Sequence, residues 1–374
     1  MSGLIGLYIH IPFCRQKCRY CDFASYAGKE NLIDTYLQAL AAEAARYKGN
    51  YFDTLYIGGG TPSLLSVNQL QKLIQIISQN FRLVGDFSES TIEANPESLT
   101  REKLDFLRQQ GINRLSIGLQ SFDDTVLKHI GRIHTVDMFL RAYENARAAG
   151  FENINVDLIA GLPGQTKIQF LEGVKKLIAL APQHISVYGL QIEEGTPFAY
   201  EGLQADEDLL REELEQIHED LPKAGYVHYE ISNFARAGKE SKHNSNYWQN
   251  GEYLGLGAAA ASYQKGVRRS NTSDLCAYIN QIKAGQTATV FSEQLTGQAH
   301  EGETILLGLR QLGGICLTAN QQNLFAKEIK ALKARGLVEQ KGNLLKLSKE
   351  GLFLANQVFM TFVGPFEKNE TDRL

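Results

Sequence analysis

The chain has 374 residues, of which 43% are hydrophobic and 21% charged, and its formal net charge is -4 at pH 7. This length predicts two or three folded units, and the composition excludes a disordered chain and a membrane-embedded one. The slight acidic excess argues against a nucleic-acid-binding protein, and we expect pairs such as Arg268 and Arg269 to be solvated surface. The N-terminal segment has neither a basic start nor a long apolar stretch, so we expect a cytoplasmic protein.

Short β-rich runs alternate with helical patterns over about the first 190 residues, which is typical of a parallel sheet with crossover helices. The six expected strands are residues 4–11, 54–57, 91–94, 114–117, 155–159 and 184–188. Periodicity alone leaves an open doubly wound sheet and a partial barrel as alternatives. Either architecture places binding loops at the carboxyl ends of the strands.

Apolar residues at helical spacing predict helices between these strands, and several helix ends are marked in the sequence. Ser66 followed by Gln69, and Thr166 followed by Gln169, match the capping box that begins a helix. Gly150 matches the residue that follows a helix. These signals support one strand-helix unit after another.

After residue 198 the pattern changes, and we interpret residues 199–290 as an accessory region. An acidic helix is expected from Asp206 to about residue 221, followed by a loop-rich stretch that contains residues 242–248. Residues 291–374 are expected to form a C-terminal domain of a different kind. Two short helices, a β-hairpin and a further helix predict a winged-helix-like domain. It lacks an evident basic recognition helix, so packing or partner contact is expected rather than DNA binding.

Three of the five cysteines, Cys14, Cys18 and Cys21, fall within eight residues, just after the first predicted strand. An odd number of clustered cysteines argues against a secreted disulfide framework and favours a metal site. A structural zinc site requires four ligands, for which the nearest additions are His10 and Asp22. A cubane iron-sulfur cluster held by three thiolates instead leaves one iron open to an external ligand.

The residues around these cysteines favour a metal site over buried structural cysteines. Arg15, Lys17 and Arg19 alternate with the cysteines, and nearby cations are expected to favour thiolates. Cys276 and Cys316 stand alone and are expected to be ordinary packed cysteines.

The cysteine triplet with an aromatic residue, Tyr20, before its last member resembles the radical SAM superfamily. Further segments are similar to the oxygen-independent coproporphyrinogen III oxidase family within it, namely residues 8–14, 58–63, 93–96, 116–121 and 157–164. This resemblance covers most of the chain. It implies an α/β fold with a partial (β/α)6 barrel over residues 1–198, and a 4Fe-4S cluster whose open iron binds S-adenosyl-L-methionine (SAM).

The cofactor pocket is expected at the strand ends. A glycine run after a strand lets the backbone approach a ligand, although such runs are also common in tight turns. Glu93 ends the third predicted strand and could accept hydrogen bonds from ribose hydroxyls, or be a solvated loop acid. The resemblance implies these cofactor-binding positions: Tyr8, Tyr20, Gly59, Gly60, Thr61, Glu93, Gln120, Arg132, Asp157 and Gln191. Without it, Arg132 would be interpreted as a surface charge.

The family has two branches, an oxidase that decarboxylates the propionates of coproporphyrinogen III and a protein that binds haem and passes it on. Three features favour the second branch: Phe23 stands where the oxidases carry an extra cysteine, their longer N-terminal extension is not seen, and residues 243–248 look like the HNxxYW motif. The resemblance therefore implies that His243, Tyr247 and Trp248 bind haem, and imidazole is a common axial ligand of haem iron. The alternative is that His243 is a structural histidine.

The leading interpretation is a cytoplasmic haem chaperone, monomer or homodimer, that delivers haem to unidentified acceptor haemoproteins, with peripheral membrane contact left open. Coproporphyrinogen oxidase activity is then expected to be absent. The alternative is a true radical enzyme, in which an electron donor reduces the cluster and SAM is cleaved to methionine and a 5'-deoxyadenosyl radical. A third interpretation is a regulatory winged-helix protein with a redox-sensing cluster.

Overall fold

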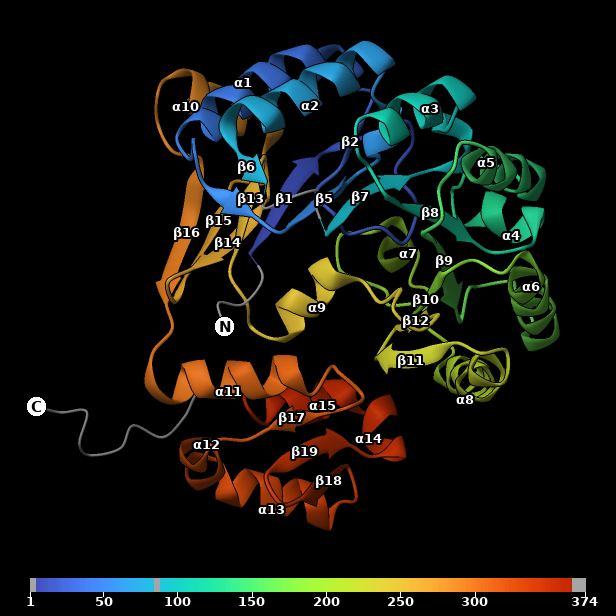
Figure 1. Ribbon diagram of the computed structural model, residues 1–374. Helices are drawn as coiled ribbons and strands as arrows, with labels where there is room; N and C mark the ends of the chain where they lie inside the picture. The colour runs from blue at the N-terminus through green and yellow to red at the C-terminus, as the bar shows by residue number, and fades with distance from the viewer. Residues whose placement is uncertain (1–4, 84–87, 365–374) are drawn as a thin grey trace, which may run out of the picture.

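A computed structural model describes residues 5–83 and 88–364 of the chain (Figure 1). Within these ranges the largest sheet has 12 strands, and its six strands from residues 6–189 pair in parallel in the order β10-β9-β8-β7-β5-β1, which a later strand, β13 (Tyr253–Leu256), extends in parallel beyond β1. The bounds of the six strands are β1 Gly6–Ile11, β5 Thr54–Gly59, β7 Glu89–Ala94, β8 Arg114–Gln120, β9 Ile154–Ala160 and β10 His184–Gly189. All six predicted strands are confirmed, and Leu4 of the first prediction lies outside the described residues.

Helices connect these strands and cover the outer face of the sheet (Figure 1). They are α1 Ile33–Ala45, α2 Val67–Asn80, α3 Arg101–Gln109, α4 Asp124–His129, α5 Val136–Ala148 and α6 Lys167–Leu180. Both predicted capping boxes are present, Ser66 with Gln69 on α2 and Thr166 with Gln169 on α6. Gly150 follows α5 with a φ of 86°, a left-handed conformation that favours glycine after a helix.

The accessory region adds strands to both edges of the same sheet. Its elements are α7 Pro197–Tyr200, α8 Glu207–Lys223, β11 Val227–Glu230, β12 Asn233–Ala235, β13 Tyr253–Leu256, β14 Ala261–Gln264, β15 Val267–Asn271, α10 Leu275–Lys283 and β16 Thr289–Gln294. The predicted acidic helix is confirmed as α8. The rest of the accessory region was expected to be rich in loops, and this expectation is wrong. Its short strands pair with the edges of the large sheet, and local sequence does not reveal such pairing. The boundary proposed at residue 290 falls inside β16.

Residues 242–248, also expected in a loop, form the helix α9 Lys242–Trp248. Its first turn is held by the carboxylate of Glu89, at the start of β7. Glu89 accepts hydrogen bonds from the Ser241 hydroxyl at 3.1 Å and from the backbone N–H groups of Lys242 and His243, each at 3.0 Å. A carboxylate at a helix N-terminus satisfies free N–H groups and the helix dipole. Helix α9 therefore lies at the amino ends of the parallel strands, between the sheet and α11 (Figure 1).

The C-terminal unit has a hydrophobic core of its own, separate from that of the large sheet. Its elements are α11 Gly297–Gly308, β17 Ile315–Cys316, α12 Ala319–Leu324, α13 Ala326–Ala334, β18 Val338–Lys341, β19 Leu344–Leu347, α14 Lys349–Phe353 and α15 Ala355–Met360. The predicted hairpin is confirmed as β18 and β19, preceded by three helices rather than two. Of the helices in the described ranges, none has the length and apolar character that crossing a lipid bilayer requires.

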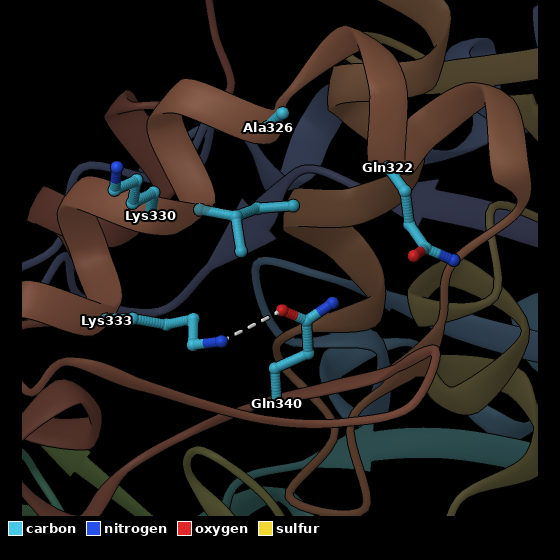
Figure 2. Close-up of a pocket in the computed structure, with 6 residues that line it drawn as sticks. Gln322, Ala326, Lys330, Lys333 and Gln340 are labelled. Atoms are coloured by element: carbon cyan, nitrogen blue, oxygen red, sulfur yellow. Dashed lines mark hydrogen bonds between the residues drawn. The ribbon is translucent and has the colours of Figure 1, made fainter.

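Helix α13 is more basic on its exposed side than the sequence analysis expected. Lys327, Lys330 and Lys333 are all exposed on it. A small cavity of about 220 Å³ lies between α12, α13 and β18, lined by Gln322, Ala326, Ile329, Lys330, Lys333 and Gln340. Figure 2 shows this pocket in close-up. The ammonium of Lys333 donates to Oε1 of Gln340 at 3.3 Å. This cavity shares no lining residue with the two cavities described below.

Candidate functional site

The three clustered cysteines lie on a loop at the carboxyl end of β1. Two short parallel strands, β2 (Phe13–Cys14) and β3 (Tyr26–Ala27), pair at the two ends of this loop. Cys14 ends β2 and is buried, whereas Cys18 and Cys21 are partly exposed. The pairing of β2 with β3 fixes where the loop leaves and rejoins the body of the protein.

The loop and the carboxyl ends of the parallel strands surround a cavity of about 450 Å³. All three cysteines line it. Nine of the ten predicted cofactor residues also line it: Tyr20, Gly59, Gly60, Thr61, Glu93, Gln120, Arg132, Asp157 and Gln191. The exception is Tyr8, which lines an adjoining cavity. The structure thus brings together residues that are up to 177 positions apart in sequence, from Cys14 to Gln191.

The glycines after β5 allow the cysteine loop to approach that strand. A Cβ atom on Gly60 would lie 3.0 Å from Sγ of Cys14. Gly59 has a φ of 116°, and a Cβ there would lie 2.6 Å from Cε1 of His10. The next residue, Thr61, donates a hydrogen bond from its hydroxyl to Sγ of Cys14 at 3.4 Å. Only glycine suits the first two positions, so the backbone stays open to the cavity.

Arg132 places a fixed positive charge beside the cysteines. Its Nη1 donates to Sγ of Cys18 at 3.7 Å, and its Nη2 donates to Oδ1 of Asn95 at 2.8 Å and to the carbonyl of Gly118 at 2.6 Å. Burial alone would lower the pKa of Arg132, but Tyr20 and Cys18 beside it raise that pKa above its ordinary value. The guanidinium therefore stays charged and can stabilise thiolates or an anionic ligand.

Two half-buried carboxyl groups, of Glu93 and Asp157, face the cavity. Glu93 accepts hydrogen bonds from the hydroxyl of Tyr56 at 2.8 Å and from the N–H of Gly59 at 2.9 Å. Asp157 accepts one from Nδ2 of Asn155 at 2.7 Å. Burial raises the pKa of Glu93 to about 7, and the negative charge of the nearby Asp157 contributes to this rise. Burial also raises the pKa of Asp157. Such groups can accept hydrogen bonds from ligand hydroxyls or donate one when protonated.

Gln120 is held in an unfavourable backbone conformation at the end of β8. Its φ is 73°, and the pairing of β8 with β9 shifts register between Gly118 and Gln120. A left-handed conformation in a non-glycine residue costs about 1–3 kcal/mol and clusters at functional sites. Oε1 of Gln120 is buried and has no hydrogen-bond partner among the described residues, although the side chain lines the cavity. Both features indicate a position shaped for a ligand rather than for stability.

The basic residues around the cysteines favour thiolates only in part. Lys17 lowers the pKa of the Cys21 thiol, as expected, but burial outweighs it. Lys17 donates to a backbone carbonyl of the loop, and Arg19 forms an ion pair with Glu201. Burial raises the pKa of the Cys14 and Cys21 thiols above its ordinary value. Binding of a metal must therefore supply the free energy that deprotonates them.

The donor set fits a cluster better than a single ion. Within the described ranges, no group of three or more His, Cys, Asp or Glu side chains converges to hold one metal ion. A structural zinc ion requires such convergence, whereas a cubane cluster binds each thiolate through a different iron. Three thiols, an arginine and a glycine-lined wall fit the cluster and the ligand on its open iron. Cys276 and Cys316 are exposed, so the expectation that they are packed is wrong.

A second cavity, of about 500 Å³, adjoins the first. Phe23, Gly59 and Glu93 line both cavities. The second cavity is bordered by β1, by α9, by the strands β13 to β15 and by α11. Its aromatic lining residues are Tyr8, Phe23, Tyr247, Trp248 and Tyr253. We call the two spaces the cluster cavity and the aromatic cavity.

His243 lines neither cavity. It is 1% exposed, and its ring stacks on Tyr56 at a centroid distance of 5.2 Å. Its Nδ1 lies 2.8 Å from the hydroxyl of Thr54 and its Nε2 lies 2.7 Å from the hydroxyl of Tyr247. Burial lowers the pKa of His243 to about 3, so the ring is neutral. Both ring nitrogens of His243 are therefore hydrogen-bonded within the protein.

Comparison with known proteins identifies the family. Residues 8–177 match the radical SAM superfamily, and residues 295–354 match the HemN C-terminal domain. The heme chaperone HemW of Bacillus subtilis (strain 168) is 37% identical over 374 residues, which cover 96% of this chain and 98% of that protein. The chain belongs to the HemW family. The HemW protein of Lactococcus lactis subsp. lactis (strain IL1403) is 36% identical over 369 residues, covering 95% of this chain and 96% of that protein.

A solved structure extends the comparison to the whole fold. Coproporphyrinogen III oxidase (HemN) from Escherichia coli, a radical SAM enzyme, matches with a TM-score of 0.87 and 25% identity. The match covers 98% of this chain and 91% of that chain. The predicted fold class and the predicted membership of the haem-chaperone branch are therefore confirmed for this HemW-family chain.

The sequence analysis missed Arg268 as a site residue of this HemW-family chain. Arg268 was expected to be solvated, but it lines the aromatic cavity and its Nε donates to Oε1 of Glu303 on α11 at 2.6 Å. Its guanidinium also lies over the ring of Tyr263, 4.6 Å from the centroid. Neighbouring residues of a strand point to opposite faces, so Arg269 is exposed while Arg268 faces inward. Recognition of β15 as a strand would have separated the two.

Proposed function

We propose that this chain binds haem in the aromatic cavity and passes it to acceptor haemoproteins, while the cluster cavity holds a 4Fe-4S cluster and SAM. The observation that carries the proposal is the junction of the two cavities. Tyr247 and Trp248 of the HNxxYW motif line the aromatic cavity, and Phe23 lines both cavities. The name of the curated relatives, heme chaperone, supports haem as the cargo.

The aromatic cavity has the chemistry that haem requires. A flat apolar macrocycle packs well against aromatic rings, and Tyr and Trp also offer a polar edge. Arg268 provides a cation that can pair with a propionate through a charge-assisted hydrogen bond. A volume of about 500 Å³ lies within the range of small-molecule and cofactor sites.

In the cluster cavity, Cys14, Cys18 and Cys21 would each hold one iron. The backbone at Gly59 and the guanidinium of Arg132 would orient the polar end of SAM, while Glu93 and Asp157 would accept hydrogen bonds from its hydroxyls. When bound, the cluster and SAM would supply one-electron chemistry. Phe23 would keep that chemistry apart from the haem.

We place the protein in the cytoplasm, as a monomer or homodimer. The acceptor haemoproteins are unidentified, and a peripheral contact with the membrane would bring the cargo to acceptors embedded there. An electron donor is required only if SAM is cleaved. The membrane contact and the donor are the parts of the proposal that depend on partners.

A second candidate function is oxygen-independent oxidation of coproporphyrinogen III. It is favoured by the 25% identity to HemN over 98% of this chain and by the cluster cavity. In that case, the substrate would occupy the aromatic cavity and its propionates would face the cluster. Phe23, which lines both cavities, occupies the position where the oxidase branch carries a cysteine, and this favours the chaperone.

One experiment separates the two functions. Anaerobically reconstituted protein is titrated with haem, then mixed with an apo-haemoprotein, and in parallel is incubated with coproporphyrinogen III, SAM and a reductant. The proposal predicts one haem per chain, transfer of that haem to the acceptor, and unchanged porphyrinogen. Decarboxylated product would favour the oxidase, and failure to bind haem stoichiometrically would contradict the chaperone.

A further inference from the structure

We infer that Tyr247, rather than His243, is the residue that binds the haem iron, and that His243 positions the oxygen of Tyr247. The inference rests on the proposed function, because it names the iron ligand of the same site. In the HNxxYW motif, the tyrosine would then contact haem in the aromatic cavity, and the histidine, which lines neither the aromatic nor the cluster cavity, would hold the tyrosine oxygen by a hydrogen bond.

The geometry of the pair carries this inference. Tyr247 lines the aromatic cavity, and its hydroxyl lies 2.7 Å from Nε2 of the buried His243. Nδ1 of His243 is fixed in turn by the hydroxyl of Thr54 at 2.8 Å. The ring of Tyr247 packs edge-on against Tyr253, with centroids 4.5 Å apart and planes at 70°. The phenol oxygen is thus held on one side by its hydrogen bond and on the other by the packing of its ring.

Other side chains of the aromatic cavity that could bind iron also have hydrogen-bond partners, but these partners differ in kind from that of Tyr247. His10 uses Nδ1 with the hydroxyl of Tyr8 and Nε2 with the carbonyl of Ala24, each at 2.9 Å. The hydroxyl of Tyr253 accepts a hydrogen bond from Nη1 of Arg268 at 3.3 Å. Tyr8 also meets a buried imidazole, but Nε2 of His10 must donate to the Ala24 carbonyl, so Nδ1 can only accept and could not hold a phenolate. Nδ1 of His243 meets a hydroxyl instead, which leaves Nε2 able to donate to the oxygen of Tyr247.

Phenolate oxygen is one of the ligand types that proteins use to hold haem iron. Ferric haem arrives with a hydroxide on iron. That hydroxide takes the phenol proton and leaves as water while the bond between iron and the Tyr247 oxygen forms, and no electron is transferred. The hydroxyl of Thr54 can accept a hydrogen bond from Nδ1 or donate one to it. For Nε2 of His243 to donate to the phenolate oxygen, the ring proton moves from Nδ1 to Nε2 by exchange with solvent. This change of tautomer adds no net proton, so the ring stays neutral.

The test is the resonance Raman spectrum of ferric haem on the full-length chain with its cluster reconstituted, with the haem-free protein as baseline. The wild-type protein is expected to show tyrosinate modes. Tyr247→Phe should lose them and bind haem about tenfold more weakly or worse, a change equivalent to about 1.4 kcal/mol. The matched control is Tyr253→Phe, which removes a neighbouring hydroxyl of the same cavity and should keep the tyrosinate modes.

Two further variants separate ligation from packing. Tyr247→His should convert the spectrum to that of an imidazole-bound haem. His243→Gln should keep the tyrosinate modes but shift their frequencies, because it changes the hydrogen bond to the ligand oxygen; a purely structural His243 would leave them in place. Wild-type protein that binds one haem without tyrosinate modes would overturn the inference and leave the proposed function intact. Wild-type protein that binds no haem would overturn both.

Discussion

The cluster cavity and the aromatic cavity share a wall but are assembled in different ways. The lining of the cluster cavity comes from the cysteine loop and the ends of parallel strands, all before residue 194. The lining of the aromatic cavity comes from β1, α9, the strands β13 to β15 and α11. The first cavity therefore belongs to the barrel alone, whereas the second lies where the barrel meets a unit with a separate core.

This difference suits two different tasks. A resident cofactor is best held by elements that share one core, because such elements do not move apart. A cargo must be loaded and released, and interfaces between units of one chain are where relative motion is expected. The contacts at this interface include the ion pair of Arg268 with Glu303 and the guanidinium of Arg310, which lies 4.2 Å from the ring centre of Trp248. Opening of the aromatic cavity would break these contacts and leave the cluster cavity unchanged.

The largest expected effect is loss of the cluster in Cys18→Ser. Two thiolates do not hold the cubane, so its visible absorption should disappear, whereas haem affinity should change much less because none of the three cysteines lines the aromatic cavity. Absorption spectra of anaerobically reconstituted protein and a parallel haem titration measure both. The control is Cys316→Ser, which changes an exposed cysteine. A cluster retained in Cys18→Ser would contradict the assignment of the ligands.

Arg268→Ala should weaken haem binding and leave the cluster in place, the reverse of Cys18→Ser. Loss of a charge-assisted hydrogen bond to a propionate should weaken haem binding about 10- to 100-fold, with the cluster unchanged. Arg269→Ala is the matched control, since Arg269 is the exposed neighbour on the same strand. Thermal unfolding of both variants checks whether the loss of the Glu303 ion pair affects the fold. Equal haem affinities in the two variants would argue against Arg268 as an anchor.

Glu93 lines both cavities, and its titration should make the stability of the folded protein depend on pH. Its pKa is raised from 4.5 to about 7 in the folded protein, so between these values the folded state binds more protons than the unfolded state. The free energy of unfolding should therefore fall as pH rises through this window, by up to about 3 kcal/mol. Denaturant unfolding at several pH values should show a weaker fall in Glu93→Gln. The same fall in both proteins would assign the pH dependence to other groups.

The cluster cavity could be predicted from the sequence because its parts carry local signals. The three cysteines lie within eight residues, and each strand-helix unit marks the strand end that faces the cavity. Resemblance to a family was still needed for Arg132, whose surroundings at Cys18 and Asn95 come from distant segments. Strand ends are predictable because periodicity and caps are local properties of the chain.

The aromatic cavity was harder to predict because it depends on long-range pairing. Helix α9 is fastened by Glu89, 154 positions before His243, and nothing near residues 242–248 reveals that partner. The direction of Arg268 depends on strands that exist only as additions to a sheet edge. The hydrogen bonds of His243 could not be predicted for the same reason. The motif suggested His243 as an iron ligand, whereas in the structure its ring nitrogens are hydrogen-bonded to Thr54 and Tyr247.

The claim that haem binds in the aromatic cavity is tested most directly through Trp248, the only tryptophan in the chain. Haem is titrated into the full-length protein while tryptophan emission is recorded, for the wild type and for Arg268→Ala and Arg269→Ala. The account predicts quenching that saturates at one haem per chain, with a midpoint shifted to higher haem concentration only in Arg268→Ala. Saturable haem binding that leaves the emission of Trp248 unchanged would contradict it.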